Sequence, residues 1–144
     1  MPLTVTPFSA PLGAEITGID LRHDLDEKSF GLIEAAWHDH QVLIIRDQDL
    51  GKDDQIGFAS RFGTVGARGL PADQRNETDD YGGAIMMITN KKDSDGNFVG
   101  SVPEGELWFH SDLSYKQKPH MATFLHAMEL PSSGGNTMFS NMYQ

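Results

Sequence analysis

The sequence predicts an α+β fold in which β-structure dominates. Apolar residues recur at helical spacing in two segments, residues 26–40 and 52–62. From residue 84 onward the chain consists of short runs with strand character, separated by turns rich in glycine and proline. A chain of 144 residues, 38% of them apolar, fits one domain with a hydrophobic core.

The first part of the chain predicts two strands followed by a helix. Residues 3–8 and 13–20 have strand character and are joined by a turn at residues 11–13. Asp26 is a suitable N-cap for the helix over residues 26–40, because its carboxylate can accept a hydrogen bond from the first turn. The expected inner face of this helix comprises Phe30, Ile33, Ala36 or Trp37, and His40.

A strand and a second helix follow. Residues 42–45 form a continuous apolar run with β-branched side chains, which is typical of a buried strand. The second helix places Ile56, Ala59 and Phe62 on one face and ends before Gly63, a common residue after a helix C-terminus.

The second half predicts a long loop and then a series of strands. Residues 64–82 are polar and rich in glycine, and ordered loops of this length are often functional. A strand over residues 84–89, a turn at 93–97 and a short return strand at 98–99 come next. Three further strands are expected at about 106–115, 120–129 and 136–141. The last strand leads directly into Gln144, so we expect an incomplete architecture.

Composition and charge exclude several classes of function. The formal net charge is −10 and no basic cluster offsets it, which argues against nucleic acid as a partner. The chain contains no cysteine, so any metal must be held by histidine and carboxylate. No apolar run is long enough to span a membrane and the N-terminus lacks a secretory signal, so we expect a cytoplasmic protein.

The sharpest candidate for chemistry is the His110-Ser111-Asp112 tripeptide in the strand expected at 106–115. Residues i and i+2 of a strand point to the same face, so His110 and Asp112 would project side by side. An imidazole and a carboxylate in that arrangement can occupy two positions of an octahedral metal site. The large apolar neighbours Trp108 and Phe109 favour a shielded place. By itself, the tripeptide also fits a surface His–Asp pair or a buried histidine bonded to its neighbour.

Four segments, taken in order, extend this hypothesis over nearly the whole chain. They are residues 12–21 (LGAEITGIDL), 40–48 (HQVLIIRDQ), 58–63 (FASRFG), and 110–112 (HSD) followed by 130–137 (LPSSGGNT). In these segments the chain resembles the N-terminal half of the taurine/2,4-dichlorophenoxyacetate dioxygenase (TauD/TfdA) family of Fe(II)- and 2-oxoglutarate-dependent enzymes. The resemblance implies a double-stranded β-helix, or jelly roll, with flanking N-terminal helices. Residues 1–144 would be the first part of that single domain.

The resemblance also implies a role for individual residues. His110 and Asp112 would bind Fe(II), and the Thr137 hydroxyl would hydrogen-bond the distal carboxylate of 2-oxoglutarate. The family usually has Gly-Gly-Asp-Thr at this place, whereas here Asn136 precedes Thr137, which keeps the size but loses the charge. Without the resemblance, Thr137 is simply a β-forming residue. The distal histidine ligand and an arginine for the co-substrate would lie beyond Gln144, so the chain alone is expected to be inactive.

The implied reaction is hydroxylation of a small organic acid with O2, with release of succinate and CO2. Arg68 in the long loop is a candidate for contact with an anionic group of the substrate, and Leu113 beside Asp112 is a candidate for the lining of the substrate pocket. Arg68 is equally well explained as a solvated loop cation. Arg46 and Arg61 are expected to form structural ion pairs. For the full-length protein we expect no nucleic-acid or membrane partner. The sequence is compatible with a homo-oligomer.

Two alternatives stay open. In the first, another metal-dependent jelly-roll enzyme uses His110, Asp112 and His126, because one register of a hairpin between 106–115 and 120–129 would bring His126 near His110. In the second, the chain is a catalytically incomplete fragment that binds metal and turns over nothing.

Overall fold

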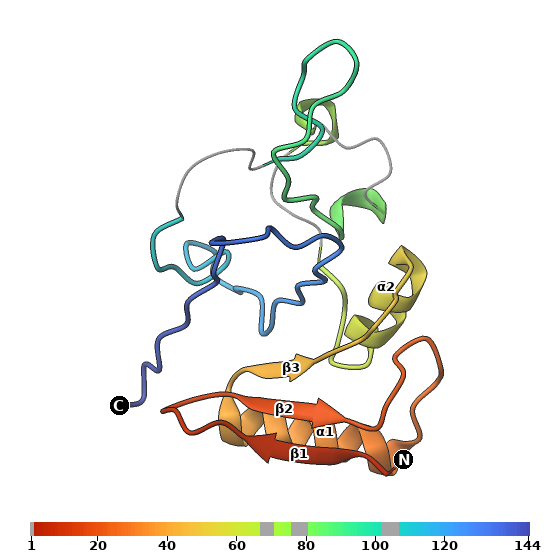
Figure 1. Cartoon of the computed structure of the whole chain (residues 1–144), viewed down its shortest axis with the longest axis vertical. Coiled ribbons are helices and arrows are strands. Elements are labelled where there is room, and N and C mark those ends of the chain that lie inside the picture. The colour runs from red at the N-terminus through yellow and green to blue at the C-terminus, as the bar shows by residue number, and fades with distance from the viewer. Residues whose placement is uncertain (1, 67–70, 76–80, 102–106) are drawn as a thin grey trace. The chain divides into compact units, whose positions relative to one another are not determined.

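The computed structural model describes residues 2–66, 71–75, 81–101 and 107–144 (Figure 1). By contacts the chain divides into two compact units, Met1–Phe62 with Phe124–Gln144, and Gly63–Thr123. In chain order, the helices and strands are β1 (Thr4–Pro7), β2 (Ala14–Thr17), α1 (Glu27–His40), β3 (Leu43–Ile45) and α2 (Lys52–Ser60), followed by the 3-10 turns η1 (Ala72–Gln74) and η2 (Tyr81–Gly83). Among the described helices, none is long and apolar enough to cross a membrane.

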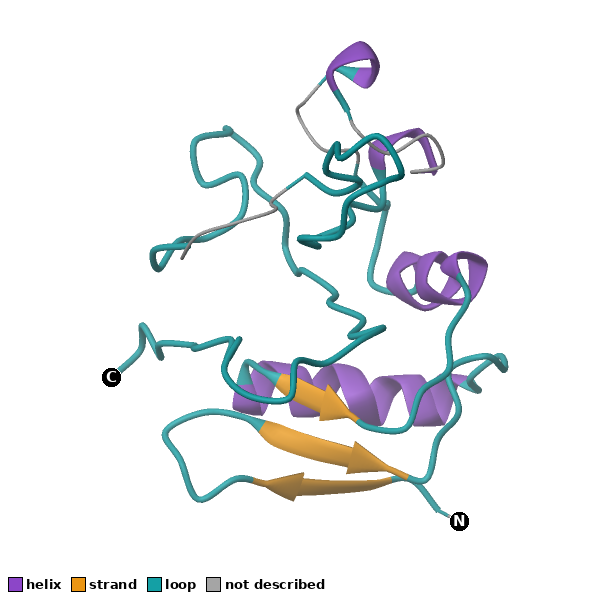
Figure 2. Ribbon diagram, turned by 45° about the horizontal axis from the view of Figure 1, so that its top comes forward, coloured by secondary structure: helices purple, strands orange, loops and turns teal. Residues whose placement is uncertain are grey.

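The first unit contains a small mixed sheet with the strand order β1-β2-β3 (Figure 2). β1 pairs antiparallel with β2, so that Val5 lies opposite Ile16, and the connection is closed by the Phe8 N–H, which donates to the Gly13 carbonyl at 3.0 Å. β3 pairs with β2 in parallel, with Ile45 opposite Ile16. Parallel neighbours need a crossover connection, and α1 provides it.

The N-terminal elements therefore confirm the expected order of strand, strand, helix, strand and helix. One detail of the expectation was wrong. The apolar run at 42–45 suggested a buried strand, whereas all three residues of β3 are half-buried. α1 packs on β2 and β3, and Figure 2 shows it along one face of the sheet, so β3 is covered on one side.

The helix α1 begins where the sequence predicts. Asp26 is its N-cap, and one carboxylate oxygen accepts from the Ser29 N–H at 2.7 Å while the other accepts from the Ser29 hydroxyl at 3.1 Å. Phe30, Ile33 and Ala36 are buried, as the helical spacing predicts. Ile33 and Ile16 of β2 are each about 1% exposed, and they are the largest fully buried side chains among the described residues.

The Asp26 cap predicts a specific dependence of stability on pH. The Ser29 N–H, and then its hydroxyl, lower the pKa of Asp26 below its ordinary value. A lowered pKa contributes stability that is fully present above the unfolded-state pKa, about 3.9, and is lost as the pH falls through the folded-state pKa. We expect Asp26→Ala to reduce the free energy of unfolding in urea at about pH 7 and to reduce it less at about pH 2. Asp24→Ala, which removes another exposed carboxylate, is the control, and an equal loss at both pH values for Asp26→Ala would contradict this account.

Phe62 lies at the centre of an aromatic cluster in the first unit. It follows α2, and its ring centroid lies 5.0 Å from that of Phe30, 5.9 Å from Trp37, 5.4 Å from Phe58 and 5.2 Å from Phe124. Most of these pairs meet edge to face, which is a favourable geometry for aromatic rings. The cluster joins α1, α2 and the segment that begins at residue 124.

Arg46 and Arg61 form ion pairs, as expected. Arg46 Nε lies 2.9 Å from Glu15 Oε1, across the β2–β3 pair. Arg61 binds Glu27 at 2.7 Å and also donates to the Leu25 carbonyl at 2.8 Å. Both arginines therefore have structural partners in the first unit.

Gln48, part of the segment that resembles the dioxygenase family, has a structural role here. Its side-chain oxygen accepts from the Leu21 N–H at 2.8 Å, and its amide nitrogen donates to the carbonyls of Ile19 at 3.2 Å and Arg46 at 2.9 Å. Leu21 is buried, so an unpaired N–H there would be costly. Gln48 thus ties the chain after β3 to the chain after β2.

The C-terminal strands expected from the sequence are not formed in the described residues. Residues 107–144 consist of bends, turns and segments without regular secondary structure. Positions 121–126 still alternate between exposed and half-buried, which is the side-chain pattern of a strand. A strand also needs a neighbour for its backbone N–H and C=O groups, and these segments have none in the part of the chain that the structure describes.

The expected hairpin around residues 93–97 is partly confirmed. The Asp93 N–H donates to the Asn97 carbonyl at 2.9 Å, and an isolated antiparallel bridge joins Lys92 to Phe98. Further along, the Ser101 N–H donates to the Met87 carbonyl at 2.9 Å. The turn and the return segment are as predicted, but residues 84–89 do not form a regular strand.

Candidate metal-binding site

His110 and Asp112 lie at the start of a tight turn. The Ser114 N–H donates to the Ser111 carbonyl at 3.2 Å, and the Lys116 N–H donates to the Leu113 carbonyl at 2.8 Å. Leu113 has a φ of 51°, in the left-handed region that a branched side chain rarely adopts. The expectation of a strand was therefore wrong for this segment.

The two side chains nevertheless come together. His110 Nε2 lies 3.2 Å from Asp112 Oδ1. The opposite atom of each side chain is bound by the protein: His110 Nδ1 lies 2.7 Å from the Trp108 carbonyl, and Asp112 Oδ2 accepts from the Thr123 hydroxyl at 2.6 Å. Each side chain is thus held at one atom by a hydrogen bond, and its other nitrogen or oxygen atom faces the partner side chain.

This arrangement fits a metal ion. Two ligand atoms at about 2.1 Å from a metal and at right angles to each other are about 3 Å apart, close to the observed separation. A carbonyl can only accept, so His110 Nδ1 must carry a proton, and Nε2 is the nitrogen that has a lone pair when the imidazole is neutral. The hydrogen bond to the Trp108 carbonyl, and then the charge and hydrogen bond of Asp112, raise the pKa of His110 above its ordinary value.

The pair is not shielded from solvent as its neighbours had suggested. The side chains of His110 and Asp112 are 53% and 43% exposed. Trp108 and Phe109 are themselves exposed, by 91% and 66%. The expectation was wrong because no layer of described residues packs against these two aromatic side chains.

Thr123 and the Trp108 carbonyl are contacts that sequence reasoning missed. The contact with the Trp108 carbonyl could not be predicted from residue type, because every residue has a backbone carbonyl. Thr123 is separated from Asp112 by 11 positions, and threonine is an ordinary residue in a segment with strand character. The only available signal was the alternation along 121–126, which places Thr123 on one face together with Met121 and Leu125.

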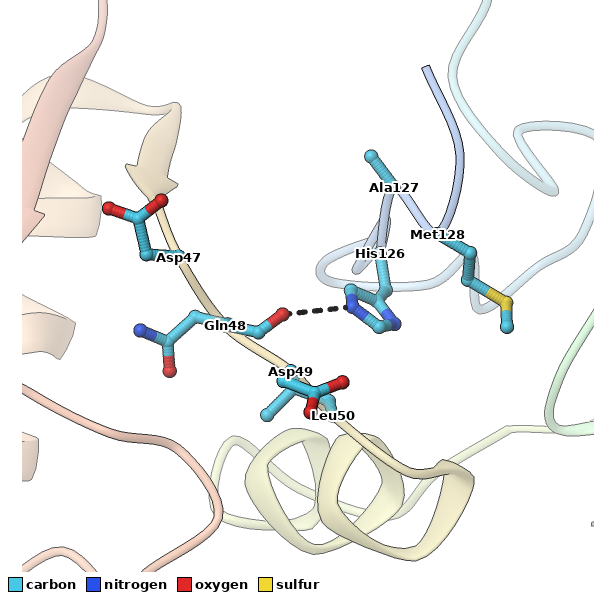
Figure 3. A pocket seen from close by; sticks show the side chains of 7 residues that line it. All are labelled: Asp47, Gln48, Asp49, Leu50, His126, Ala127 and Met128. Atoms are coloured by element: carbon cyan, nitrogen blue, oxygen red, sulfur yellow. Dashed lines mark hydrogen bonds between the residues drawn. The ribbon is translucent and has the colours of Figure 1, made fainter.

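His126, the alternative third ligand, lies in the first unit. Its Nε2 lies 3.2 Å from the Gln48 carbonyl oxygen, a contact drawn as a dashed line in Figure 3. It lines a pocket of about 490 Å³ with Asp47, Gln48, Asp49, Leu50, Ala127 and Met128. The Asp47 carboxylate points away from the imidazole in Figure 3. Among the described residues, no group of three or more histidine, aspartate or glutamate side chains is arranged to hold a metal ion.

The other candidate residues are placed as follows. Thr137 is exposed, in a segment of the first unit without regular secondary structure. Gly134 and Gly135 before it have φ values of 74° and 69°, which confirms the expected turn at residues 131–135. Leu113 is half-buried in the turn after Asp112, and Arg68 lies outside the described residues. The role of each in binding stays a prediction.

Comparison with known proteins decides the family. The family model described as "Taurine catabolism dioxygenase TauD, TfdA family" matches residues 4–144. The chain belongs to the TauD/TfdA family.

The chain is similar to several named enzymes. The chain is 33% identical over 150 residues to an (S)-phenoxypropionate/alpha-ketoglutarate-dioxygenase from Delftia acidovorans, covering 97% of this chain and 47% of the relative. It is 34% identical to a pentalenolactone F synthase from Streptomyces avermitilis, covering 99% of this chain and 46% of the relative. A solved taurine dioxygenase from Burkholderia xenovorans matches 45% of this chain and 24% of its own, at 36% identity and a TM-score of 0.42. The chain thus spans about half the length of these two sequence relatives.

Proposed function

We propose that this chain provides two iron ligands and a co-substrate contact of an Fe(II)- and 2-oxoglutarate-dependent dioxygenase. The observation that carries the proposal is the pair His110 Nε2 and Asp112 Oδ1, 3.2 Å apart, each on a side chain anchored at its other end. Membership of the TauD/TfdA family supports this assignment of the pair over a surface His–Asp contact. The enzyme would hydroxylate a small organic acid and release succinate and CO2.

Bound Fe(II) would supply the activation of oxygen and of a substrate C–H bond. The residues of this chain would bind the metal and orient its ligands. His110 contributes a neutral imidazole, and Asp112 contributes one carboxylate oxygen and one negative charge. Two protein donors of this kind leave coordination positions for 2-oxoglutarate. We assign the hydroxyl of Thr137 to the distal carboxylate of that co-substrate, on the resemblance of residues 130–137.

The proposal also covers the complete fold of the domain and the chemical class of the substrate. The strand-like alternation along 121–126 supports a sheet that is completed in the whole protein, and we infer that this sheet is a jelly roll. The D. acidovorans relative is named for phenoxypropionate, a small organic acid. We infer a substrate of that chemical class, with Leu113 and Arg68 as candidate contacts, and a cytoplasmic location.

Calorimetric titration of the chain with Mn(II) tests the proposal, because Mn(II) prefers the same donors and does not oxidise readily. We expect one Mn(II) per chain and tighter binding when 2-oxoglutarate is present, since the keto acid supplies further oxygen ligands to the metal. An Mn(II) affinity that 2-oxoglutarate leaves unchanged, or no stoichiometric binding, would contradict the proposal.

A second candidate, a chain that binds metal without turnover, is favoured by one observation. The described residues bring together two donor side chains rather than three. Succinate formation coupled to consumption of 2-oxoglutarate by this chain would exclude the second candidate.

A further inference from the structure

The two oxygens of the Asp112 carboxylate have different partners. Oδ1 faces His110 Nε2 at 3.2 Å, whereas Oδ2 accepts a hydrogen bond from the Thr123 hydroxyl at 2.6 Å. Both contacts lie within the unit Gly63–Thr123. The bond to Thr123 is short and involves a charged acceptor, which is the stronger class of protein hydrogen bond.

We propose that Thr123 is a positioning residue that holds Asp112 as a monodentate metal ligand through Oδ1. The inference rests on the proposed function, because it concerns the same His110–Asp112 pair. A carboxylate can bind a metal through one oxygen or chelate it through both. The Thr123 hydroxyl fixes the carboxylate through one lone pair of Oδ2, so that Oδ1 is the oxygen that faces His110 Nε2 and is placed to bind the same metal.

The local structure explains why Asp112 needs such a partner. Its side chain is 43% exposed and belongs to a turn, so neither packing nor a sheet restricts its rotation. An unrestrained carboxylate would lose rotational freedom on binding a metal, and Thr123 removes much of that freedom beforehand. Hydrogen bonds to the non-ligating atoms of metal ligands commonly orient the ligand and increase metal affinity.

Monodentate binding also has a chemical consequence. Chelation through both oxygens would occupy a further coordination position. A metal held by His110 Nε2 and Asp112 Oδ1 keeps that position for exogenous ligands, which this reaction class requires. Thr123 would therefore influence both how tightly the metal binds and how many positions stay open.

Two substitutions separate the hydroxyl from the shape of the side chain. Thr123→Val is close to isosteric but cannot donate, whereas Thr123→Ser keeps the hydroxyl and loses the methyl group. We expect Thr123→Val to weaken Mn(II) binding in calorimetry by roughly 10-fold to 100-fold, the usual effect of losing such a partner, and Thr123→Ser to bind much as the wild type does. Thr6→Val, the same change on the exposed strand β1, should leave Mn(II) affinity unchanged.

Infrared difference spectra of the Mn(II)-loaded chain provide a readout that a purely structural role would not change. The separation between the antisymmetric and symmetric carboxylate stretches is larger for a monodentate than for a chelating carboxylate. We expect the large separation in wild type and Thr123→Ser, and a smaller one in Thr123→Val. The Asp112→Ala variant identifies the carboxylate bands of Asp112, because these bands should be absent from its spectrum.

The outcomes distinguish this inference from the proposed function. If Asp112→Ala binds Mn(II) as the wild type does, the proposed function fails. If Asp112→Ala loses Mn(II) but Thr123→Val keeps wild-type affinity and the same carboxylate bands, the site stands and the role of Thr123 is overturned. Should Thr123→Val not fold, Thr123→Ala is the second variant without a hydroxyl, and full Mn(II) affinity in it would overturn the inference equally.

Discussion

Replacing Asp112 or His110 with alanine is expected to weaken Mn(II) binding by the chain by about a hundredfold or more. Losing only an outer hydrogen-bond partner of a metal ligand already costs roughly 10-fold to 100-fold, so losing the ligand itself should cost at least as much. Nε2 of His110 and Oδ1 of Asp112 lie 3.2 Å apart, and no third histidine or carboxylate is grouped with them among the described residues, so removal of either side chain leaves one candidate ligand. Calorimetry of the two variants against wild type measures the effect.

Two variants serve as controls. Asp95→Ala removes a carboxylate from the same unit, in the turn at residues 93–97, and should bind Mn(II) as the wild type does. His126→Ala tests the alternative ligand. Loss of Mn(II) in His126→Ala, together with normal binding in Asp112→Ala, would overturn the assignment and move the metal to the pocket at Asp47, Asp49 and His126.

Substituting Phe62 with alanine is expected to lower the free energy of unfolding by about 3 kcal/mol, the range for removing a large aromatic side chain from a packed site. Phe62 is half-buried, but its ring contacts those of Phe30, Trp37, Phe58 and Phe124. The substitution therefore leaves four aromatic rings without their common neighbour. Unfolding in urea, followed by circular dichroism, measures the loss.

Phe139→Ala is the matched control, because Phe139 belongs to the same unit and its side chain is 53% exposed. Phe139→Ala should lower the free energy of unfolding much less than Phe62→Ala does, since an exposed ring has fewer contacts to lose. Equal losses for the two variants would show that the cluster around Phe62 does not stabilise the unit.

The N-terminal elements could be predicted because their signals are local. The α1 cap at Asp26 and the buried face at Phe30, Ile33 and Ala36 depend on residues within a few positions of one another. The paired strands β1 and β2 are joined by a short connection, so their pairing was also close in sequence. The aromatic cluster was not predicted, since Phe62 and Phe124 come from distant parts of the chain.

The C-terminal segments could not be predicted in the same way. The alternation typical of a strand indicates which side chains share a face. A strand forms, however, only where a second strand makes hydrogen bonds with its backbone N–H and C=O groups. Residues 121–126 show the alternation without the pairing. For the same reason the shielding expected from Trp108 and Phe109 was absent: apolar side chains become buried only when another layer covers them.

The sequence by itself determined the family and the candidate side chains of the site, because both depend on residue types in order: His110, Asp112, and the segments around them. Only the tertiary structure decided how the pair is presented. A turn, rather than a strand, brings Nε2 and Oδ1 to 3.2 Å, and the Trp108 carbonyl and the Thr123 hydroxyl hold the opposite atoms. Orientation depends on hydrogen bonds between groups that the path of the backbone brings together. No pattern of residue types records that path.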